Sequence, residues 1–458
     1  MKISIIGAGY VGLTTAACLA ELGHEVFCAE SDAQKLNSLK SGVMPFFEPH
    51  LDQMVVKNSA AGRLQFGRTE EAIDRGQAIF ICVGTPPLDN GEADLSAIEH
   101  VARVIAARAH GYKLIVEKST VPVQTGRQLR RHMARHNTNQ LDYDVVSNPE
   151  FLREGSAVED FFHPDRIVIG VESERAAAQM REIYKPVLEG KFACPAHVQC
   201  RQEKEPVFLV TDTNSAELIK HASNSFLAMK ISFINMVADL CEAAGADVTQ
   251  VARGIGIDAR IGASFLKPGI GFGGFCFPKD LQAFVRIAEK FGCDFSLLRE
   301  VERVNQSRVE KFIEKIRKEL WVLRGKKIAI WGLAFKPETD DIRFAPSLQI
   351  IRRLLSEGAI LQAYDPQAME KAKKELPDLT YCRDVYEASQ GTEAIVLLTE
   401  WDEFRKADWA RLHGLMERAL IVDGRNALSS ETVAAHGFHY VGIGGISSVP
   451  DMTPSVAH

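Results

Sequence analysis

The feature that most constrains the fold is a glycine pattern near the N-terminus, Gly7-Ala8-Gly9-Tyr10-Val11-Gly12. It follows an apolar run, Ile3–Ile6, and precedes an apolar stretch of helical period, Leu13–Leu22. In such a strand–turn–helix unit the first glycine permits a tight turn, the second lets a pyrophosphate approach the backbone, and the third allows close helix–strand packing. The helix N-terminus offers free N–H groups to that pyrophosphate. The pattern therefore predicts a dinucleotide-binding α/β domain.

An acidic residue, Glu30, ends the next expected strand. It lies near the offset of about 20 residues at which a carboxylate accepts the ribose hydroxyls of a dinucleotide. Because a carboxylate there repels a 2′-phosphate, NAD⁺ is the expected cofactor. A glycine-rich turn followed by a solvated glutamate is the alternative, and strand, helix and acid together favour the cofactor. Thr85, in the turn Val83-Gly84-Thr85-Pro86, follows another strand at its ligand-binding end.

Apolar runs alternate with helical stretches at both ends of the chain, which predicts two Rossmann-like, doubly wound α/β domains joined by a long central helix and a helical middle domain. The expected domains are residues 1–212, 213–312 and 313–445, with a disordered tail over 446–458. One helix is expected over 213–245, with Ser215 as its cap. The expected strands are Ile3–Ile6, Glu25–Ala29, Ala78–Val83, Leu114–Glu117, Asp144–Val146, Ile167–Val171, Phe208–Val210, Lys327–Trp331, Ile360–Tyr364, Ile395–Leu398 and Leu420–Val422.

Composition narrows the class of protein. A chain of 458 residues is too long for one ordinary core, and its net charge of -6 argues against a general nucleic-acid binder. No apolar run approaches the roughly 20 residues that span a bilayer, and the N-terminus enters a strand at once, so we expect a cytoplasmic protein without a membrane partner. The nine cysteines form no CxxC pair, which indicates a reducing compartment, and no metal site is expected.

Three segments carry candidate chemistry. In Gly271-Phe272-Gly273-Gly274-Phe275-Cys276-Phe277-Pro278-Lys279-Asp280, a cation beside the cysteine favours its thiolate, although a buried structural cysteine is an equal alternative. Lys220 and Asn224 share one face of the long helix, where a snorkelling lysine and an exposed asparagine are the alternative. Glu150 and Glu154 follow another strand, a spacing that more often marks a solvated face. Lys336, in the first turn of the second α/β domain, suits a nucleotide diphosphate better than a second dinucleotide.

These segments belong to an ordered series of motifs: GAGYVGL, GTPP with ADLS, KSTVPV, NPEFLREG, AELIKHASNSFLA, GFGGFCFPKD, GLAFKPETDDIR, and LTEW with DGRN. On these motifs the chain resembles the UDP-glucose/GDP-mannose dehydrogenases, most closely the bacterial-type UDP-glucose 6-dehydrogenases, from Met1 to about Gly442. The resemblance implies NAD in the N-terminal domain, a UDP-sugar in the C-terminal domain, and a homodimer or higher homo-oligomer built on the long helix. It also implies oxidation of UDP-glucose to UDP-glucuronate with two NAD⁺ and one water.

The resemblance further implies roles for individual residues. Cys276 is the nucleophile, Lys220 and Asn224 stabilise oxyanions, and Asp280 pairs with Lys220 and handles protons through water. Glu154 assists hydrolysis and Thr120 positions a water. The implied cofactor contacts are Gly7, Gly9, Tyr10, Val11, Gly12, Glu30, Lys35, Thr85, Thr120, Glu154, Lys279 and Arg343. The implied substrate contacts are Glu150, Phe151, Leu152, Lys220, Asn224, Arg260 (reaching the neighbouring subunit's sugar), Phe265, Lys267, Phe272, Gly273, Phe335, Lys336 and Arg425.

One departure leaves the substrate open. Phe275 stands where the family usually has serine, and its bulk bears on the sugar pocket. The alternatives are the same chemistry on GDP-mannose or a UDP-N-acetylhexosamine, and a non-catalytic nucleotide-sugar or NAD sensor. A two-electron hydroxyacid dehydrogenase would need neither Cys276 nor a second nucleotide domain.

Overall fold

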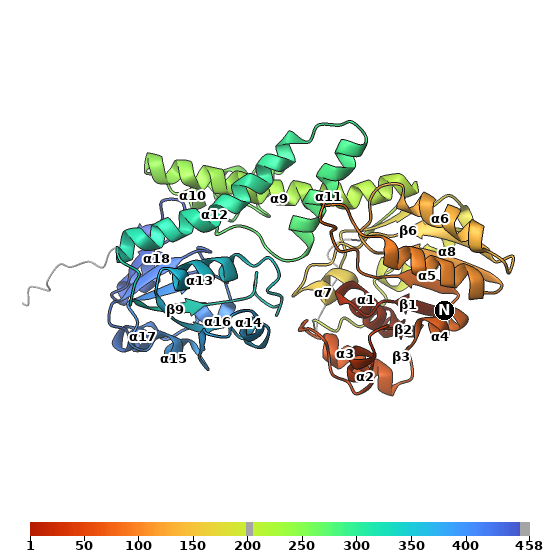
Figure 1. The fold of residues 1–458 in the computed structure, drawn as a ribbon, viewed down its shortest axis with the longest axis horizontal. Coiled ribbons are helices and arrows are strands. Elements are labelled where there is room, and N and C mark those ends of the chain that lie inside the picture. Colours follow the sequence, from red (N-terminus) through yellow and green to blue (C-terminus); the bar gives the residue numbers. More distant parts are fainter. Residues whose placement is uncertain (198–204, 449–458) are drawn as a thin grey trace, which may run out of the picture. The chain divides into compact units, whose positions relative to one another are not determined.

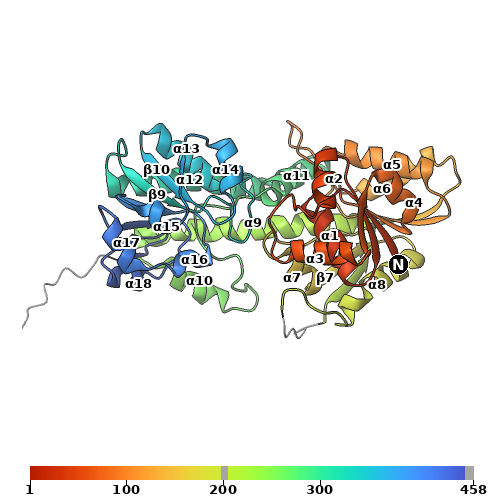
Figure 2. The same cartoon turned by 90° about the horizontal axis from the view of Figure 1, so that it is seen from below.

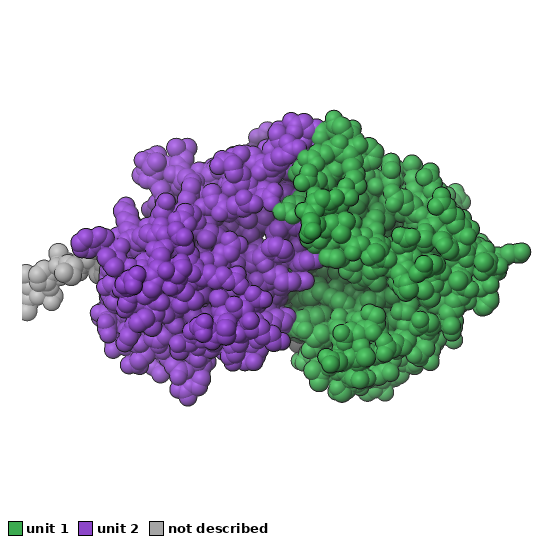
Figure 3. All heavy atoms as spheres, viewed as in Figure 1, with its two compact units in different colours: residues 1–223, 282–293 green, residues 224–281, 294–458 purple. Residues whose placement is uncertain are grey.

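The computed structural model describes residues 1–197 and 205–448 and divides into two compact units (Figure 3). Unit 1 comprises Met1–Ser223 and Gln282–Cys293, and unit 2 comprises Asn224–Leu281 and Asp294–His458. Two helices, α9 (Thr213–Ala244) and α11 (Cys276–Lys290), contribute residues to both units. The three domains expected from the sequence divide the chain differently, and their boundaries stay a prediction.

Unit 1 contains an eight-stranded sheet in the order β3-β2-β1-β4-β5-β6-β7-β8. All neighbouring strands are parallel except β6 and β7. The central strands are continuous apolar runs because both faces of the sheet are covered. The strands are β1 (Lys2–Ile6), β2 (Glu25–Ala29), β3 (Leu64–Gly67), β4 (Ala78–Ile81), β5 (Tyr112–Glu117), β6 (Asp142–Ser147), β7 (Arg166–Gly170) and β8 (Val207–Thr211).

Helices cover both faces of this sheet (Figures 1 and 2). One buried cluster joins the strands to α1, α3, α7 and α8, and a second joins the opposite face to α4, α5 and α6. The strand order reverses between β1 and β4, so the turns after these strands border the crevice where ligands of such sheets bind. The helices are α1 (Tyr10–Glu21), α2 (Ala33–Lys40), α3 (Leu51–Ala60), α4 (Thr69–Arg75), α5 (Ser96–Arg108), α6 (Thr125–His136), α7 (Ala157–Phe162) and α8 (Glu174–Leu188).

Unit 2 contains a seven-stranded sheet in the order β11-β10-β9-β12-β13-β14-β15, in which only the last pair is antiparallel. One face packs on α12, α13 and the second half of α9, and the other on α15 to α18. The strands are β9 (Lys327–Trp331), β10 (Ile360–Tyr364), β11 (Thr380–Tyr381), β12 (Ala394–Leu397), β13 (Leu420–Asp423), β14 (His439–Val441) and β15 (Ser447–Ser448). The helices are α10 (Val248–Gly256), α12 (Ser296–Leu320), α13 (Pro346–Ser356), α14 (Met369–Glu375), α15 (Val385–Ser389), α16 (Asp402–Arg405), α17 (Trp409–Leu415) and α18 (Ser430–Ala435).

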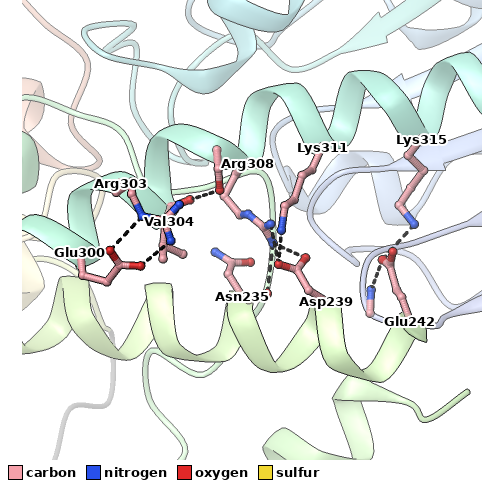
Figure 4. Close-up of polar contacts among 11 residues, drawn as sticks. Asn235, Asp239, Glu242, Glu300, Arg303, Val304, Arg308, Lys311 and Lys315 are labelled. Atoms are coloured by element: carbon pink, nitrogen blue, oxygen red, sulfur yellow. Dashed lines mark hydrogen bonds and ion pairs between the residues drawn. The ribbon is translucent and has the colours of Figure 1, made fainter. Parts of the chain in front are cut away.

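Polar contacts fasten α9 to α12 inside unit 2 (Figure 4). The buried guanidinium of Arg308 donates to both carboxylate oxygens of Asp239 at 2.8 Å and to the carbonyl of Asn235 at 3.0 Å. One turn further along α9, Glu242 pairs with Lys315 of α12 at 2.9 Å. Because the Arg308 side chain is only 3% exposed and paired bidentately, this contact holds the helices more firmly than surface ion pairs do.

The fold confirms the predicted class of two doubly wound α/β sheets linked by a long helix. The expected helix cap was wrong. The Asp212 carboxylate accepts the N–H of Ser215 at 3.0 Å and its hydroxyl at 2.6 Å, so the helix begins at Thr213. In the expected tail, β15 pairs with β14, and residues 449–458 lie outside the described part. No helix within the described residues is long and apolar enough to cross a membrane.

Candidate active site

The glycine turn after β1 forms a cradle in which each glycine has a different reason to be there. Gly7 has a φ of +103°, and a Cβ there would lie 2.7 Å from the Cys82 carbonyl oxygen. A Cβ on Gly12 would lie 1.8 Å from the Gly7 carbonyl oxygen, so helix α1 packs too closely for any side chain. A Cβ on Gly9 would meet nothing within 4 Å, which leaves space for a ligand against the backbone. These features fit the phosphates of a dinucleotide.

Glu30 lies directly after β2 with its carboxylate held in place. It accepts the N–H of Asp32 at 3.0 Å and pairs with Lys35 at 2.9 Å. Burial alone would raise the pKa of Glu30, but the Asp32 hydrogen bond and Lys35 hold it below its usual value. The residue is therefore an anion at neutral pH, as an acceptor for ribose hydroxyls must be.

The turns after β4 and β5 are joined at the same sheet edge. The Thr85 hydroxyl donates to the Thr120 carbonyl at 2.9 Å, which links the two predicted site residues. Lys118, two residues before Thr120, is a buried polar residue that the sequence analysis missed. Lys118 donates to the Asn148 side-chain oxygen at 3.3 Å, and Tyr184 donates to the same oxygen at 2.7 Å. Burial lowers the pKa of Lys118.

A second missed residue, Glu48, holds the loop that carries Glu154. The carboxylate of Glu48 accepts the N–H of Gly155 at 2.6 Å and the N–H of Ala157 at 2.7 Å. It also accepts the hydroxyl of Tyr10, the first residue of α1. Because Glu48 is 4% exposed, this bonding fixes the loop beside the cofactor cradle. No local pattern around Glu48 signals this role.

Lys220, near the start of α9, is held within unit 1. Its ammonium lies 2.8 Å from Glu150 Oε1, and both side chains are about 5% exposed. Glu150 also accepts the N–H of Leu152 at 2.6 Å. The Phe151 ring lies against two cations, with the Arg166 guanidinium 4.0 Å and the Lys220 ammonium 5.5 Å from its centroid. The pair Lys220–Glu150 is thus a fixed, desolvated cation–carboxylate unit rather than a snorkelling lysine and a solvated acid.

Asn224, one turn further along α9, is held within unit 2. Its side-chain amide donates to Asp280 Oδ2 at 2.6 Å, and Lys279 lies 2.9 Å from Asp280 Oδ1. Asn224, Lys279 and Asp280 are all buried. The pairing of Asp280 with Lys220 implied by the family resemblance joins residues of the two units and stays a prediction.

Cys276 is the first residue of α11, directly after the glycine-rich loop, and its side chain is exposed. The helix begins at the cysteine itself. A helix N-terminus stabilises an adjacent anion, so this position favours a thiolate. The alternative of a buried structural cysteine is therefore wrong.

The loop before Cys276 is held by close packing in unit 2. A Cβ on Gly273 would lie 2.5 Å from the Phe344 carbonyl oxygen, and one on Gly274 would lie 2.7 Å from the Phe335 ring. Asn305 of α12, missed by the sequence analysis, accepts the Phe272 N–H at 2.8 Å and donates to its carbonyl at 3.0 Å. These contacts determine where the loop ends and α11 begins.

Arg425 and Arg343 also reach this loop. Arg425 donates to the carbonyls of Gly271, Phe335 and Leu398 at 2.9–3.0 Å, so its guanidinium braces three turns of unit 2. Arg343 lies over the Phe275 ring, 4.6 Å from the centroid, and Lys279 lies 5.8 Å from it. Phe275 therefore fills the position usually held by a serine with a ring between two cations.

The remaining predicted contacts of unit 2 are more open. Arg260 is 89% exposed in its side chain and pairs with Asp258, and Lys267 is also exposed. Phe265 has a φ of +64° and its ring lies 6.2 Å from that of Phe277. Lys336 is half-buried, with its ammonium 5.5 Å from the Phe335 ring centroid.

A buried aspartate distinguishes the first turn of this second sheet from the glycine cradle of unit 1. Asp365 Oδ2 accepts the N–H groups of Leu333 at 2.7 Å and Ala334 at 3.1 Å. These are the backbone donors that a dinucleotide pyrophosphate would need. The turn is therefore unsuited to a second dinucleotide, in agreement with the sequence analysis.

The predicted residues thus fall into two groups. Unit 1 contains the glycine cradle with Tyr10 and Val11, Glu30, Lys35, Thr85, Thr120, Glu150, Phe151, Leu152, Glu154 and Lys220. Unit 2 contains Asn224, Arg260, Phe265, Lys267, Phe272, Gly273, Cys276, Lys279, Asp280, Phe335, Lys336, Arg343 and Arg425. Their roles stay predictions.

Profiles of a single family match the chain in three successive segments. They describe an NAD binding domain over residues 1–188, a central domain over 214–307 and a UDP binding domain over 329–430. The chain belongs to the UDP-glucose/GDP-mannose dehydrogenase family. NAD is accordingly the cofactor, and the chain is an NAD-dependent dehydrogenase, as the glycine cradle and Glu30 predicted.

Relatives cover this dehydrogenase from end to end. It is 46% identical to a UDP-glucose 6-dehydrogenase of Rhizobium meliloti over 97% of this chain and 99% of that one. It is 43% identical to the UDP-glucose 6-dehydrogenase TuaD of Bacillus subtilis over 97% and 93% of the two chains. The solved structure of a UDP-glucose dehydrogenase from Pyrobaculum islandicum is 37% identical, with a TM-score of 0.86 over 97% and 98%.

Proposed function

We propose that this dehydrogenase oxidises UDP-glucose twice at C6 and releases UDP-glucuronate. The observation that carries the proposal is Cys276, an exposed thiol at the start of α11 behind a loop fixed by glycine packing. A simple alcohol dehydrogenase needs no nucleophile, whereas a four-electron oxidation needs a group that retains the aldehyde. End-to-end similarity to the UDP-glucose 6-dehydrogenases supports the substrate.

In this scheme Cys276 retains the half-oxidised sugar. Its thiolate adds to the C6 aldehyde, forming a carbon–sulfur bond and placing negative charge on the former carbonyl oxygen. NAD, bound in the cradle and exchanged between the two oxidations, supplies the hydride acceptor. Loss of hydride from the adduct leaves a thioester on the cysteine. The covalent bond explains why no free aldehyde has to leave the site.

Lys220 and Asn224 are the proposed donors to the oxygen at C6. Both residues are almost completely shielded from solvent, at 4% and 8% exposed. A hydrogen bond to a developing oxyanion stabilises it most in such surroundings. Each is preoriented by a carboxylate, Glu150 for the lysine and Asp280 for the asparagine. Little reorganisation is then needed when charge develops on the substrate.

The thioester is hydrolysed in the last step. A water attacks the carbonyl carbon, the carbon–sulfur bond breaks and the Cys276 thiolate leaves, which releases a carboxylate and one proton. Glu154 and Thr120 are the proposed groups that position this water, and Asp280 is the proposed relay for the proton. The Glu48 contacts to Gly155 and Ala157 hold the backbone around Glu154, which supports a positioned rather than a mobile carboxylate.

The nucleotide of the substrate is assigned to unit 2. Lys267, Lys336 and Phe335 are the proposed contacts to the diphosphate and base, and Arg425 acts chiefly by bracing the turns that present them. Arg260 is exposed and suited to reach the sugar bound by a second copy of the chain. The family's UDP binding domain covers most of these positions.

The test is the number of NADH molecules formed per UDP-glucose, followed by absorbance with limiting substrate. Two NADH with UDP-glucuronate as product is the expected result. One NADH with an aldehyde product would refute the covalent scheme. Turnover with GDP-mannose or a UDP-N-acetylhexosamine but not UDP-glucose would move the assignment to that sugar, and Phe275, which stands where the family usually has serine, is the residue to examine in that case.

We further propose that the enzyme is a homodimer or higher homo-oligomer assembled through α9. Four large apolar side chains are exposed at helical spacing on that helix: Phe226 (59%), Phe233 (48%), Met236 (45%) and Leu240 (67%). A stripe of this kind on a folded protein usually marks a protein interface. Light scattering of Phe233→Glu against the unchanged chain tests it, with a monomer expected for the variant. We also propose a cytoplasmic location, the compartment expected from the sequence.

A further inference from the structure

Three potential metal ligands gather in a part of unit 1 that the proposed reaction does not use. His163 directly follows α7, and Cys194 and His197 belong to the connection between α8 and β8. His163 Nε2 lies 3.3 Å and His197 Nδ1 lies 3.5 Å from the sulfur of Cys194. The three ligand atoms all lie within 4.8 Å of one another.

The two sulfur–nitrogen separations agree with those around a tetrahedral zinc ion. With Zn–S near 2.3 Å and Zn–N near 2.0–2.1 Å, a tetrahedral centre places sulfur and nitrogen about 3.5 Å apart. A thiolate with two imidazoles is also the donor set that zinc prefers over the hard cations Mg²⁺ and Ca²⁺. Both the geometry and the chemistry therefore point to the same ion.

Neighbouring side chains contact the two histidines, as residues around zinc ligands usually do. Glu159 Oε1 of α7 lies 3.6 Å from His197 Nε2, the ring nitrogen that does not face the sulfur. A carboxylate at that nitrogen orients a ligand histidine and fixes its tautomer. The Phe192 ring packs 5.5 Å from that of His163 and 5.1 Å from that of Phe162, which gives one side of the cluster an apolar wall.

We infer that His163, Cys194 and His197 bind one Zn²⁺ ion, with the fourth position taken by water or another donor. The ion ties the α8–β8 connection to the end of α7. Since the proposed oxidation does not use this cluster, the ion's role here is to hold these two segments of unit 1 together. The sequence analysis expected no metal, and the proposed ligand His163 lies 31 residues before Cys194, too far to form a local motif with it.

The test measures metal binding in the full chain. Chelator-stripped protein is loaded with Zn²⁺ alone, freed of excess ion and assayed for zinc per chain. One ion per chain is expected, and Co²⁺ in its place should show a thiolate-to-cobalt charge-transfer band with tetrahedral d–d absorption. Cys194→Ser should abolish the charge-transfer band. Glu159→Gln should retain the ion with an affinity about 10- to 100-fold lower, as loss of an orienting carboxylate does.

Matched controls separate this site from other thiols and imidazoles of unit 1. Cys293→Ser and His110→Asn change exposed residues of the same unit and should leave zinc binding unchanged. Zinc content in Cys194→Ser equal to that of the unchanged chain would overturn the inference, as would a stripped chain that takes up no ion. Because the readout is metal content and absorbance, the result does not depend on the proposed oxidation of UDP-glucose.

Discussion

Replacing Gly273 by alanine tests whether the packing of the cysteine loop sets the position of the nucleophile. A Cβ there would lie 2.5 Å from the Phe344 carbonyl oxygen, 2.9 Å from Pro346 Cδ and 3.2 Å from Ala345 Cα. Ordinary contact begins near 3.4 Å, so the loop must move by about 0.9 Å. Two of these three atoms belong to the neighbouring backbone, which does not yield easily. The loop is therefore expected to move rather than its neighbours, against the restraint of its hydrogen bonds to Asn305.

The displacement is transmitted to Cys276, three residues further along. A misplacement of about 1 Å in a reacting group costs roughly 100-fold in rate, equivalent to about 2.7 kcal/mol of activation free energy. We therefore expect Gly273→Ala to lower kcat for UDP-glucose by about 100-fold. Initial rates of NADH formation measure kcat and KM, and thermal unfolding of each protein verifies that it is folded.

Gly254→Ala is the matched control for this experiment. Gly254 lies in α10, and a Cβ there would meet nothing within 4 Å. Alanine is more favourable than glycine in a helix by roughly 0.5–1 kcal/mol, so this variant should be as stable or more stable and fully active. A folded Gly273→Ala enzyme with kcat within threefold of the unchanged enzyme would refute the argument that loop packing positions the thiol.

Three further predictions concern single side chains. Cys276→Ser should fail to complete the second oxidation, because a serine ester hydrolyses far more slowly than a thioester; normal release of uronate by this variant in a product assay would contradict the covalent role. Glu30→Gln should raise the rate with NADP relative to NAD, and NADP use that stays negligible would show that another group discriminates. Burial raises the pKa of Glu117 to about 8, so the folded chain retains a proton that the unfolded chain releases above its ordinary value of 4.5. The free energy of unfolding that this retained proton contributes is fully present below the ordinary pKa of 4.5. It is lost as pH rises through about 8, with a slope of up to about 1.4 kcal/mol per pH unit. Glu117→Gln should flatten this part of the fall in melting temperature between about pH 4.5 and about pH 8, and an unchanged profile would show that Glu117 does not titrate there.

Most strands that the sequence predicted are apolar and buried on both faces, whereas β8, which was also predicted, is largely exposed. β4, and β9 after Lys327, consist of consecutive apolar residues because helices cover them on each side. The strands that were missed, β3, β11, β14 and β15, lie at or next to the edges of their sheets. They are short and partly exposed, so they lack an apolar run and are recognisable only through their partners.

The candidate site was predictable where chemistry depends on a local pattern. Gly7 and Gly12 are required by contacts within their own turn or with the adjacent strand, and Gly9 leaves open space there, so the spacing of the three glycines carries the signal. Glu48, Asn305 and Asp365 were missed for the opposite reason. Each is a carboxylate or amide that holds backbone groups 31 to 109 residues away, a role that no local sequence pattern signals.

The long helix sets the spacing between the two proposed oxyanion donors, which have different supports. Glu217 fastens the first part of α9 to unit 1 by accepting the N–H groups of Gln124 at 2.6 Å and Gly126 at 2.7 Å. Asp239 fastens its later part to α12 in unit 2. Lys220 and Asn224 lie between these anchors, one turn apart on a continuous helix, so their spacing of about 6 Å is set by the helical rise. The geometry of the proposed oxyanion donors therefore depends on the backbone of α9, while Glu150 and Asp280 determine only how each donor is oriented.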